Sequence, residues 1–336
     1  MESRELNDTG IQVSAIGFGV WTVSTTMWGI SDPVVSRSLL RAGFENGITF
    51  YDTADVYGDG SGETLLAEAL GPQRDQIVIA TKFGYDFYNH PGLQPGQRER
   101  PHDWSPAFLR TACERSLKRL GTDRIDLYQL HNPRLDALRA DELWAELERL
   151  RDEGKVRAIG AALGPALRPD RQGEEGVVTV RDRRAAVQII YNLLEQQLGE
   201  AVFPAAREAA RSVFVRVPHS SGLLEESYDE STTFAPGDHR QHRVPTDEAR
   251  RAWLLDGLKK VEQLSFLKRD GQRTLGQAAL RFVLAEPSVT SVLPNIYNEA
   301  QIAEFAAATD TPPLDSDELE RVAALYRTGF GLAAAA

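Results

Sequence analysis

The chain has 336 residues, of which 42% are hydrophobic and 26% are charged, and these proportions are typical of a globular protein with a large core. A net charge of −11 argues against nucleic acid or an anionic membrane as the main partner. No apolar run of about 18 residues is present, and the start, MESRELNDTG, lacks the apolar core of a signal peptide. The single cysteine, Cys113, has no base near it in sequence, so a packed thiol in a reducing compartment is favoured over a nucleophile. We therefore expect a cytoplasmic protein without membrane segments.

Strand-like and helix-like runs alternate along the chain. Residues 5–13 predict a small hairpin that turns at Asp8, Thr9 and Gly10 and covers one end of the fold as a lid. Strands are predicted at residues 13–20, 48–52, 77–82, 126–130, 156–161, 186–191, 213–217 and 289–293. Helices are predicted at residues 33–46, 62–70, 106–120, 141–153, 200–211, 275–285 and 299–308, with an extra C-terminal helix at 315–327 that Asp315 or Ser316 caps.

Eight short apolar strands separated by amphipathic helices indicate an α/β protein whose parallel sheet closes into a (β/α)8 TIM barrel. A doubly wound sheet is less favoured, because no Gly-x-Gly-x-x-Gly turn follows the first strand. We expect residues 1–330 to form one domain and residues 331–336 to form a disordered tail.

Three connections are too long for simple turns between a strand and a helix: residues 85–104, 163–183 and 219–252. Loops that follow the strands of such a barrel lie at its C-terminal face, where ligands bind. The first and third of these connections are therefore the candidate walls of a substrate pocket.

Three successive strands each end with an ionisable side chain. By the two-residue alternation of a strand, Asp52, Lys82 and His131 each share a face with the apolar residues that precede them. A carboxylate on an apolar face is costly unless it is neutralised, and Lys82 offers Asp52 a partner. We therefore expect the chemistry to lie at the ends of these strands.

The segments YDTADVYG, IATKFG and LYQLHNP resemble the signature of the aldo-keto reductase family in order, spacing and strand context. The resemblance extends over about residues 13–326. It implies a catalytic tetrad of Asp52, Tyr57, Lys82 and His131, in which Tyr57 donates a proton to a carbonyl. It also implies a nicotinamide cofactor, since no side chain can supply hydride.

Elementary chemistry supports these roles. A free phenol is a weak acid near neutrality, and an adjacent ammonium favours its phenolate form, so Lys82 would make Tyr57 a better proton donor. Asp52 would keep a buried Lys82 charged, and a neutral His131 would donate to the carbonyl oxygen and orient it. The alternatives are a structural Asp52–Lys82 pair, a rim tyrosine and a core histidine, and the coincidence of all four positions favours catalysis.

The expected cofactor contacts depart from the family pattern. The family has Gly-Val-Ser-Asn after the fifth strand, whereas this chain has GAAL, so Ala162 and Leu163 replace the side chains that hold the carboxamide. Gln188 matches the third carboxamide contact, and Arg216 replaces an aromatic residue under the nicotinamide. Because a cation repels the oxidised ring, we predict tighter binding of the reduced cofactor.

Other cofactor contacts are predicted in the glycine-rich loop after the first strand, at Gly19 and Trp21. Ser220 and Ser221 suit a pyrophosphate-binding loop, with a simple polar turn as the alternative. After the eighth strand the family binds a 2′-phosphate with cations, but the corresponding residues here are neutral or acidic: Asn295, Asn298, Glu299, Gln301 and Glu304. NADP(H) is the family default, and NAD(H) is a second option.

Aromatic residues in the predicted mouth loops indicate a partly apolar pocket for a small carbonyl compound, lined by Trp21, Trp28, Tyr57, Tyr85, Trp104 and His131. Two histidines in DHRQHR, His239 and His242, have no cysteine or third ligand nearby, so no metal site is predicted. We interpret this basic segment as solvated surface, with attraction of an anion as the alternative.

The leading hypothesis is an NAD(P)H-dependent reductase of an aldehyde or ketone. A nicotinamide-binding regulatory protein with little turnover is the first alternative, which the carboxamide-site departures favour and the complete tetrad disfavours. A barrel enzyme of sugar-phosphate chemistry that uses no nicotinamide is the second.

Overall fold

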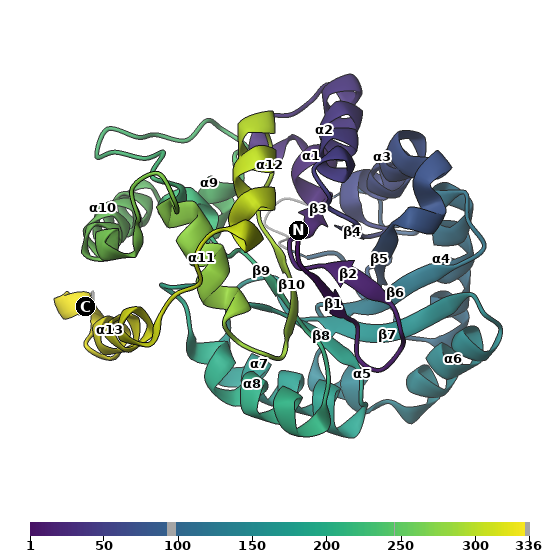
Figure 1. The fold of residues 1–336 in the computed structure, drawn as a ribbon. Coiled ribbons are helices and arrows are strands. Elements are labelled where there is room, and N and C mark those ends of the chain that lie inside the picture. Colours follow the sequence, from purple (N-terminus) through teal and green to yellow (C-terminus); the bar gives the residue numbers. More distant parts are fainter. Residues whose placement is uncertain (93–98, 245, 333–336) are drawn as a thin grey trace.

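A nearly closed barrel of parallel strands forms the centre of the computed structural model, which describes residues 1–92, 99–244 and 246–332, without the side chains of residues 242 and 243 (Figure 1). The eight strands are hydrogen-bonded in the order β10-β9-β8-β7-β6-β5-β4-β3. Their bounds are β3 Phe18–Gly19, β4 Phe50–Asp52, β5 Val78–Phe83, β6 Ile125–His131, β7 Val156–Ala162, β8 Ala186–Ile190, β9 Val213–Arg216 and β10 Val289–Leu293. A parallel bridge between Ile16 and Val292 joins the two ends of the sheet. The predicted (β/α)8 barrel is confirmed.

Helices surround the barrel. Their bounds are α1 Trp21–Ser24, α2 Pro33–Glu45, α3 Ser61–Leu70, α4 Pro106–Leu120, α5 Leu135–Arg139, α6 Asp141–Asp152, α7 Pro169–Val177, α8 Gln197–Ala209, α9 His239–Arg243, α10 Asp247–Gln263, α11 Leu275–Leu284, α12 Glu299–Ala306 and α13 Ser316–Arg327. Short 3-10 turns are η1 Thr26–Trp28, η2 Tyr57–Gly60, η3 Gly71–Gln76, η5 Ser220–Glu225, η6 Ser265–Leu267, η7 Ala307–Asp310 and η8 Gly329–Gly331, and η4 Val178–Asp182 is a π-helical turn. Contacts link α2 to α3, α3 to α4 and α4 to α6, and then α7 to α8, α11 to α12 and α12 back to α2. The helices α10 and α13 lie outside this ring.

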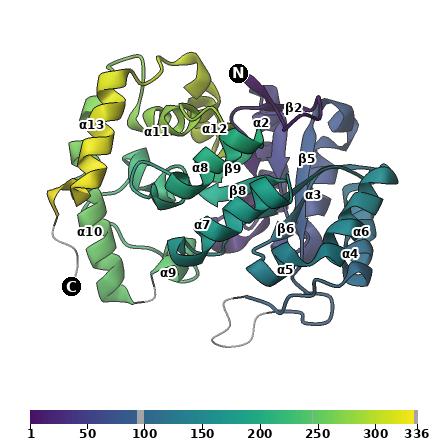
Figure 2. The ribbon, with the colours of Figure 1, turned by 90° about the horizontal axis from the view of Figure 1, so that it is seen from below.

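The N-terminal hairpin closes one end of the barrel. Its strands, β1 Ser3–Glu5 and β2 Gln12–Ser14, pair antiparallel. Leu6, Ile11 and Val13 are at most 3% exposed and pack with the apolar side chains inside the barrel, which include Phe50 and Phe214. In Figure 2 the N-terminus and β2 lie at one end of the barrel and α9 at the other. The predicted lid is therefore confirmed, and ligands have to reach the barrel from the α9 end.

The first barrel strand is shorter than predicted. Residues 13–20 were predicted as one strand, but Val13 and Ser14 belong to the hairpin strand β2, and β3 holds only Phe18 and Gly19. Ser14 Oγ accepts hydrogen bonds from the main-chain N–H groups of Thr49 and Phe50 at 3.0 and 3.1 Å. Ser14 is thus fixed between the hairpin and the residues that lead into β4. For this reason residues 13–20 bend at this point and do not form one straight strand.

Two predicted loops contain helices. The connection 163–183 forms α7 and η4, and the connection 219–252 contains α9 and the start of α10. The buried side of α7 carries Gln172 and Glu175, and only Leu254, Gly257 and Val261 of α10 are buried. Helices whose buried faces are polar or narrow give no apolar periodicity, so the sequence did not predict them.

The residue types that cap helices predicted helix ends more reliably than apolar periodicity predicted the helices in long connections. The side chain of Asp315 accepts a hydrogen bond from the Glu318 N–H at 2.9 Å, which confirms the predicted cap of α13. Of the predicted tail at 331–336, residues 333–336 lie outside the described part of the chain. Among the residues that the structure describes, none of the helices combines the length and the apolar character that crossing a bilayer would require.

Candidate active site

The ends of β4 and β5 bring three predicted catalytic groups together. Lys82 Nζ donates to Asp52 Oδ1 at 2.6 Å, to the Thr53 carbonyl at 2.7 Å and to Tyr57 Oη at 3.2 Å. The side chain of Lys82 is 1% exposed. An ammonium has three donors, and all three are used here, so the position of Nζ under the phenol is fixed.

Asp52 is fully bonded as well. Its Oδ2 accepts from Gln129 Nε2 at 3.0 Å and from Gln188 Nε2 at 2.9 Å. Gln188, predicted as a carboxamide contact, thus uses its amide N–H on Asp52. Burial is the largest influence on the pKa of Lys82 and lowers it, but the interactions with Asp52 and Tyr57 together outweigh burial, so that the pKa is raised and the ammonium form persists.

His131 lies at the end of β6, with its ring 5.7 Å from that of Tyr57. Burial, together with the positive charge of Lys82, holds the pKa of His131 well below its ordinary value, so the imidazole is neutral at physiological pH. Its Nδ1 has no hydrogen-bond partner among the described residues, while the main-chain oxygen of His131 lies 3.1 Å from His102 Nε2. A neutral imidazole beside a phenol can orient a carbonyl oxygen between them.

Part of the predicted substrate pocket adjoins this group. The ring of Tyr85 lies 4.9 Å from that of His131 and stacks on His102 at 4.2 Å, and His102 stacks on Trp104 at 4.9 Å. Tyr85 Oη accepts a hydrogen bond from Asn132 Nδ2 at 2.7 Å. The loop after β5 therefore forms an aromatic wall beside the tetrad.

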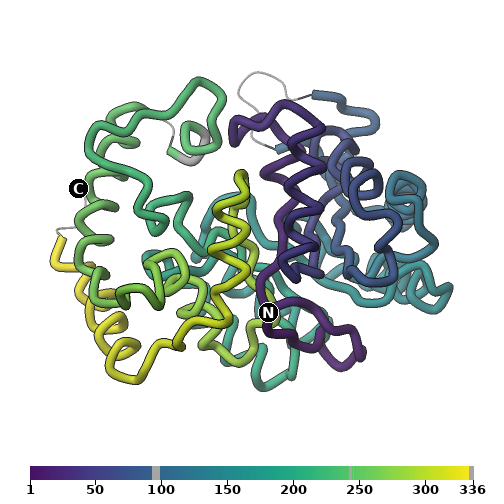
Figure 3. The backbone as a smooth tube through the Cα atoms, turned by 45° about the horizontal axis from the view of Figure 1, so that its top comes forward, coloured from purple at the N-terminus to yellow at the C-terminus, as the bar shows by residue number. Residues whose placement is uncertain are grey.

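The other predicted pocket residues, Trp21 and Trp28, form a separate aromatic cluster. The ring of His239 lies 4.7 Å from Trp21 and stacks on Trp28 at 5.7 Å, and Tyr297 stacks on Trp28 at 5.4 Å. Figure 3 shows the green chain around α9 beside the purple N-terminal chain. Because His239 and Arg240 are half-buried in this contact, the interpretation of DHRQHR as solvated surface was wrong for these two residues. The side chain of His242 lies outside the described part.

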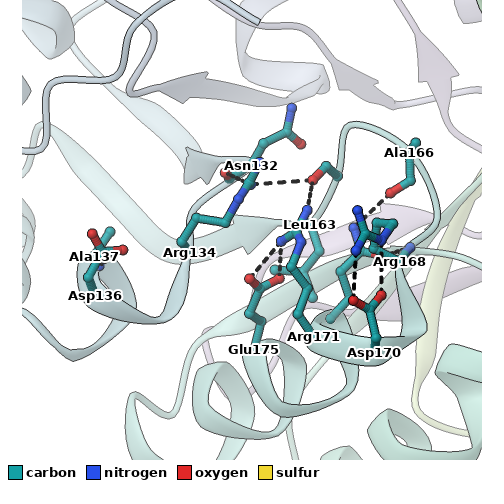
Figure 4. A network of polar contacts seen from close by, with 12 residues as sticks. Asn132, Arg134, Asp136, Ala137, Leu163, Ala166, Arg168, Asp170, Arg171 and Glu175 are labelled. Atoms are coloured by element: carbon teal, nitrogen blue, oxygen red, sulfur yellow. Dashed lines mark hydrogen bonds and ion pairs between the residues drawn. The ribbon is translucent and has the colours of Figure 1, made fainter. Parts of the chain in front are cut away.

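After β7, arginine side chains bond the main-chain carbonyls of the segment in which the expected polar side chains are missing. Arg171 Nη2 donates to the Gly164 carbonyl at 2.7 Å, and Arg216 Nη2 donates to the carbonyls of Leu163 and Pro165 at 3.0 Å each. Figure 4 shows Arg134 and Arg171 converging on this segment. A Cβ at Gly164 would lie 2.4 Å from Asn132 Oδ1 and 2.7 Å from Arg216 Nη2, so a larger residue there would displace these side chains. The segment is thus held by arginines from α7, from β9 and from the residue before α5.

The predicted phosphate loop is buried. Ser220 and Ser221 are at most 2% exposed, and Ser220, Ser221 and Gly222 have φ angles of 47°, 60° and 99°. The N–H groups of Ser220 and Gly222 bond to the carbonyls of Val217 and His219 at 3.1 Å each. Ser221 Oγ, in contrast, has no partner among the described residues. A hydroxyl is therefore the group that this loop offers to a ligand.

Gly19, Asn295 and Gln301, which are also predicted cofactor contacts, lie in β3, after β10 and in α12. Gly19 ends β3, and a Cβ there would lie 3.9 Å from the Pro294 carbonyl. Asn295 is half-buried, and Gln301 Nε2 donates to Glu225 Oε2 at 2.9 Å. Glu225 and the arginines Arg134 and Arg171 were missed, because their contacts are with residues distant in sequence or with main-chain carbonyls, which no periodic pattern indicates.

No group of three or more His, Cys, Asp or Glu side chains with the arrangement of a metal site occurs in the part of the chain that the structure describes. The Cys113 thiol is buried, and burial raises its pKa to about 12, as expected of a packed and unreactive thiol.

Comparison with known proteins supports the resemblance seen in the sequence. Residues 15–327 match the model of the Aldo/keto reductase family. The chain is 32% identical over 312 residues to the aldo-keto reductase YhdN of Bacillus subtilis, covering 92% of this chain and 89% of that protein. It is 28% identical to an NADH-specific methylglyoxal reductase of Escherichia coli, covering 94% and 96%. The holo structure of an aldo-keto reductase from Bacillus halodurans superposes with a TM-score of 0.74 at 27% identity, covering 97% and 96%.

Proposed function

The chain belongs to the aldo/keto reductase family and is an NAD(P)H-dependent oxidoreductase of aldehydes and ketones, and we propose that it reduces a small carbonyl compound with Tyr57 as the proton donor. The observation that carries this proposal is the buried chain of contacts in which Lys82 Nζ bonds both Asp52 and Tyr57 Oη. It joins a charged amine to a phenol whose ring lies 5.7 Å from that of His131.

Each group of the tetrad has a defined task in this proposal. Tyr57 Oη holds the proton and gives it to the substrate oxygen as negative charge develops there. Lys82 stabilises the phenolate that remains, and Asp52 keeps Lys82 charged and in place. His131, being neutral, donates a hydrogen bond to the same substrate oxygen and orients it. A reduced nicotinamide, when bound, supplies the hydride.

The residues at the mouth suit a dinucleotide. The carboxamide would lie against Gln188 and the segment of Ala162 and Leu163, which offers no polar side chain. The half-buried Arg216 would lie under the ring, and the unpartnered Ser221 Oγ would face the phosphates. A relative described as NADH-specific supports NAD(H) as a cofactor beside the family default, NADP(H).

The aromatic wall of Tyr85 and Trp104 beside His131 favours a carbonyl group attached to an apolar or planar substituent. The proposal is tested by following nicotinamide absorbance with a panel of aliphatic and aromatic aldehydes and ketones. We expect turnover of aldehydes with a kcat of about 1 s⁻¹ or more. Tight binding of a nicotinamide cofactor without turnover of any carbonyl would contradict the proposal and favour the regulatory alternative.

A further inference from the structure

A run of left-handed residues follows Tyr57 in the chain. Gly58, Asp59 and Gly60 have φ angles of 57°, 55° and 98°, and α3 begins directly after them at Ser61. Glycine adopts this conformation without steric cost, whereas Asp59 carries a Cβ and keeps it only where the surrounding structure holds it. The position of the chain beside Tyr57 therefore depends on what contacts Asp59.

The side chain of Asp59 pairs with Arg100, which comes from the loop after β5. Arg100 Nη2 lies 2.6 Å from Asp59 Oδ1, and the guanidinium lies 5.8 Å from the centre of the Phe87 ring. The side chain of Arg100 is only 11% exposed, while that of Asp59 is 51% exposed. Because the arginine is largely covered and its guanidinium is planar and rigid, it holds the carboxylate at a defined place.

The segment that carries Arg100 is itself fixed. Glu99, the residue before it, accepts a hydrogen bond from Tyr85 Oη at 2.6 Å and pairs with Arg134 Nη2 at 2.9 Å. Two residues after Arg100, His102 forms an antiparallel bridge with Tyr85. Since Arg134 lies in the loop after β6, residues 99 and 100 connect the loops that follow β4, β5 and β6.

Small movements of the Tyr57 loop would change the reaction geometry. Lys82 Nζ donates to Tyr57 Oη at 3.2 Å, which is at the long end of the range for a hydrogen bond. The Tyr57 N–H donates to the Ala54 carbonyl at 3.1 Å. The Asp59 N–H donates to the Val56 carbonyl at the same distance. A shift of the phenol by about 1 Å would break its contact with the amine and lower the rate by about 100-fold.

From this arrangement we propose that Arg100 is a positioning residue, which fixes the loop of Tyr57 by holding Asp59 in its left-handed conformation. It acts through Asp59 and the main chain and takes no part in the proton transfer itself. The catalytic part of the inference rests on the proposed function, whereas the effect on the loop does not.

Hydrogen–deuterium exchange of the protein without cofactor tests the loop by itself. Arg100→Met removes the guanidinium and keeps an apolar stem, so the peptide that contains Tyr57 and Asp59 should exchange at least about fivefold faster. Arg37→Met is the matched control, since it removes an ion pair of 2.9 Å to a carboxylate of similar exposure, that of Glu68, between α2 and α3. This control should leave exchange of the same peptide unchanged. Unchanged exchange in Arg100→Met would overturn the proposal.

Steady-state kinetics with an aldehyde substrate test the catalytic consequence. Arg100→Met should lower kcat about tenfold, with KM and the dissociation constant of the reduced cofactor within about twofold of the original values. Asp59→Asn removes the charge but keeps a residue type that tolerates the left-handed conformation, so it should lower kcat less. The double variant should be no slower than Arg100→Met alone, because both changes remove the same interaction. Arg37→Met should keep the original kcat.

Two kinetic results would overturn the positioning role while leaving the proposed function intact. One is an Arg100→Met variant that keeps more than about half of the original kcat, and the other is a double variant in which the two losses multiply. Absence of turnover in the unaltered protein would overturn the proposed function and the catalytic part of this inference. Amide exchange decides independently whether Arg100 holds the loop.

Discussion

At the ends of β4, β5 and β6 the side chains form hydrogen bonds with one another, whereas at the ends of β7 and β9 arginine side chains form hydrogen bonds with main-chain carbonyls. In the first region Lys82 and two glutamines donate hydrogen bonds to Asp52, and Lys82 also bonds Tyr57. In the second region Arg171 and Arg216 bond the carbonyls of residues 163–165. The C-terminal end of the barrel thus combines two features. One is a side-chain network, which suits proton transfer. The other is a loop at residues 163–165 whose carbonyls are bonded by arginines, here called the braced loop, which suits docking of a flat ring.

The difference shows which part tolerates substitution. A side-chain network depends on the identity of each member, since the buried Asp52 and Lys82 bond specific partners within it. A braced loop is held through its main-chain carbonyls, which every residue type carries, so its conformation does not depend on polar side chains at Ala162 and Leu163. The predictions below test this contrast, from the largest expected effect to the smallest.

The largest effect is expected from Lys82→Met, which leaves the Asp52 carboxylate buried without its cation. Breaking a buried ion pair by removing one partner costs about 3–5 kcal/mol of unfolding free energy. Denaturation in urea measures the loss, and kcat should fall below detection in the same variant. Arg124→Met, which removes an exposed pair with Asp75, is the control and should change neither quantity. A stability loss of less than about 1 kcal/mol in Lys82→Met would contradict the account of the first region.

These two regions also differ in how far the sequence predicts them. Strand alternation is a local rule, and it predicts that Asp52, Lys82 and His131 face the inside of the barrel. The residues two or four positions before them, Phe50, Ala80 and Leu127, are buried in the apolar cluster there. The bond between Gln188 and Asp52 spans 136 residues and has no local signal.

Main-chain contacts are harder still to predict. Every residue has a main-chain carbonyl, so the sequence does not show which carbonyls Arg171 and Arg216 will bond. The helix α7, which carries Arg171, was missed because its buried face is polar, with Gln172 and Glu175. The family resemblance supplied Tyr57 as the proton donor, while Glu225 became visible only in three dimensions.

A second carboxylate in the first region sharpens the contrast with Asp52. Both oxygens of Asp55 are buried without a partner among the described residues. Burial and the negative charge of Glu63 raise the pKa of Asp55 well above its ordinary value, although Arg119 and Lys82 act against this. The unfolded chain releases this proton above about pH 4 and the folded chain keeps it, so stability falls as pH rises from there towards the folded pKa.

Asp55→Asn removes this titration and should raise the unfolding free energy at pH 7 by about 1–3 kcal/mol. Thermal unfolding of both proteins between pH 4 and pH 8 measures the effect, and the difference between them should grow with pH. A difference that is constant with pH would show that Asp55 does not titrate in this way.

In the second region the charge of Arg216 should discriminate between the two redox states of the cofactor. An oxidised nicotinamide is a cation and is repelled by the guanidinium, so we expect the reduced form to bind about tenfold more tightly. Arg216→Met should bring the two dissociation constants together in a fluorescence titration. Equal constants for the unaltered protein would refute this expectation.

The smallest effect is expected from loss of one arginine contact to the braced loop. Arg171→Met removes the bond to the Gly164 carbonyl, and it is combined with Glu175→Gln because Arg171 is also the cation that pairs with the buried Glu175 carboxylate. The double variant should weaken binding of reduced cofactor a few-fold, at a cost of about 1 kcal/mol in stability. Arg168→Met, on the same segment, removes only an exposed contact with Asp170 and should leave both quantities unchanged. Equal changes in cofactor affinity and stability in the two variants would show that the loop does not depend on the contact of Arg171 with the Gly164 carbonyl.

The central claim, that Tyr57 delivers the proton, is tested most directly by Tyr57→Phe, which removes one oxygen and keeps the ring. We measure kcat for the best aldehyde substrate and the dissociation constant of the reduced cofactor in the same preparation. The account predicts a fall in kcat of about 10³-fold with cofactor affinity unchanged within about twofold. A variant that keeps more than about a tenth of the original kcat would contradict it.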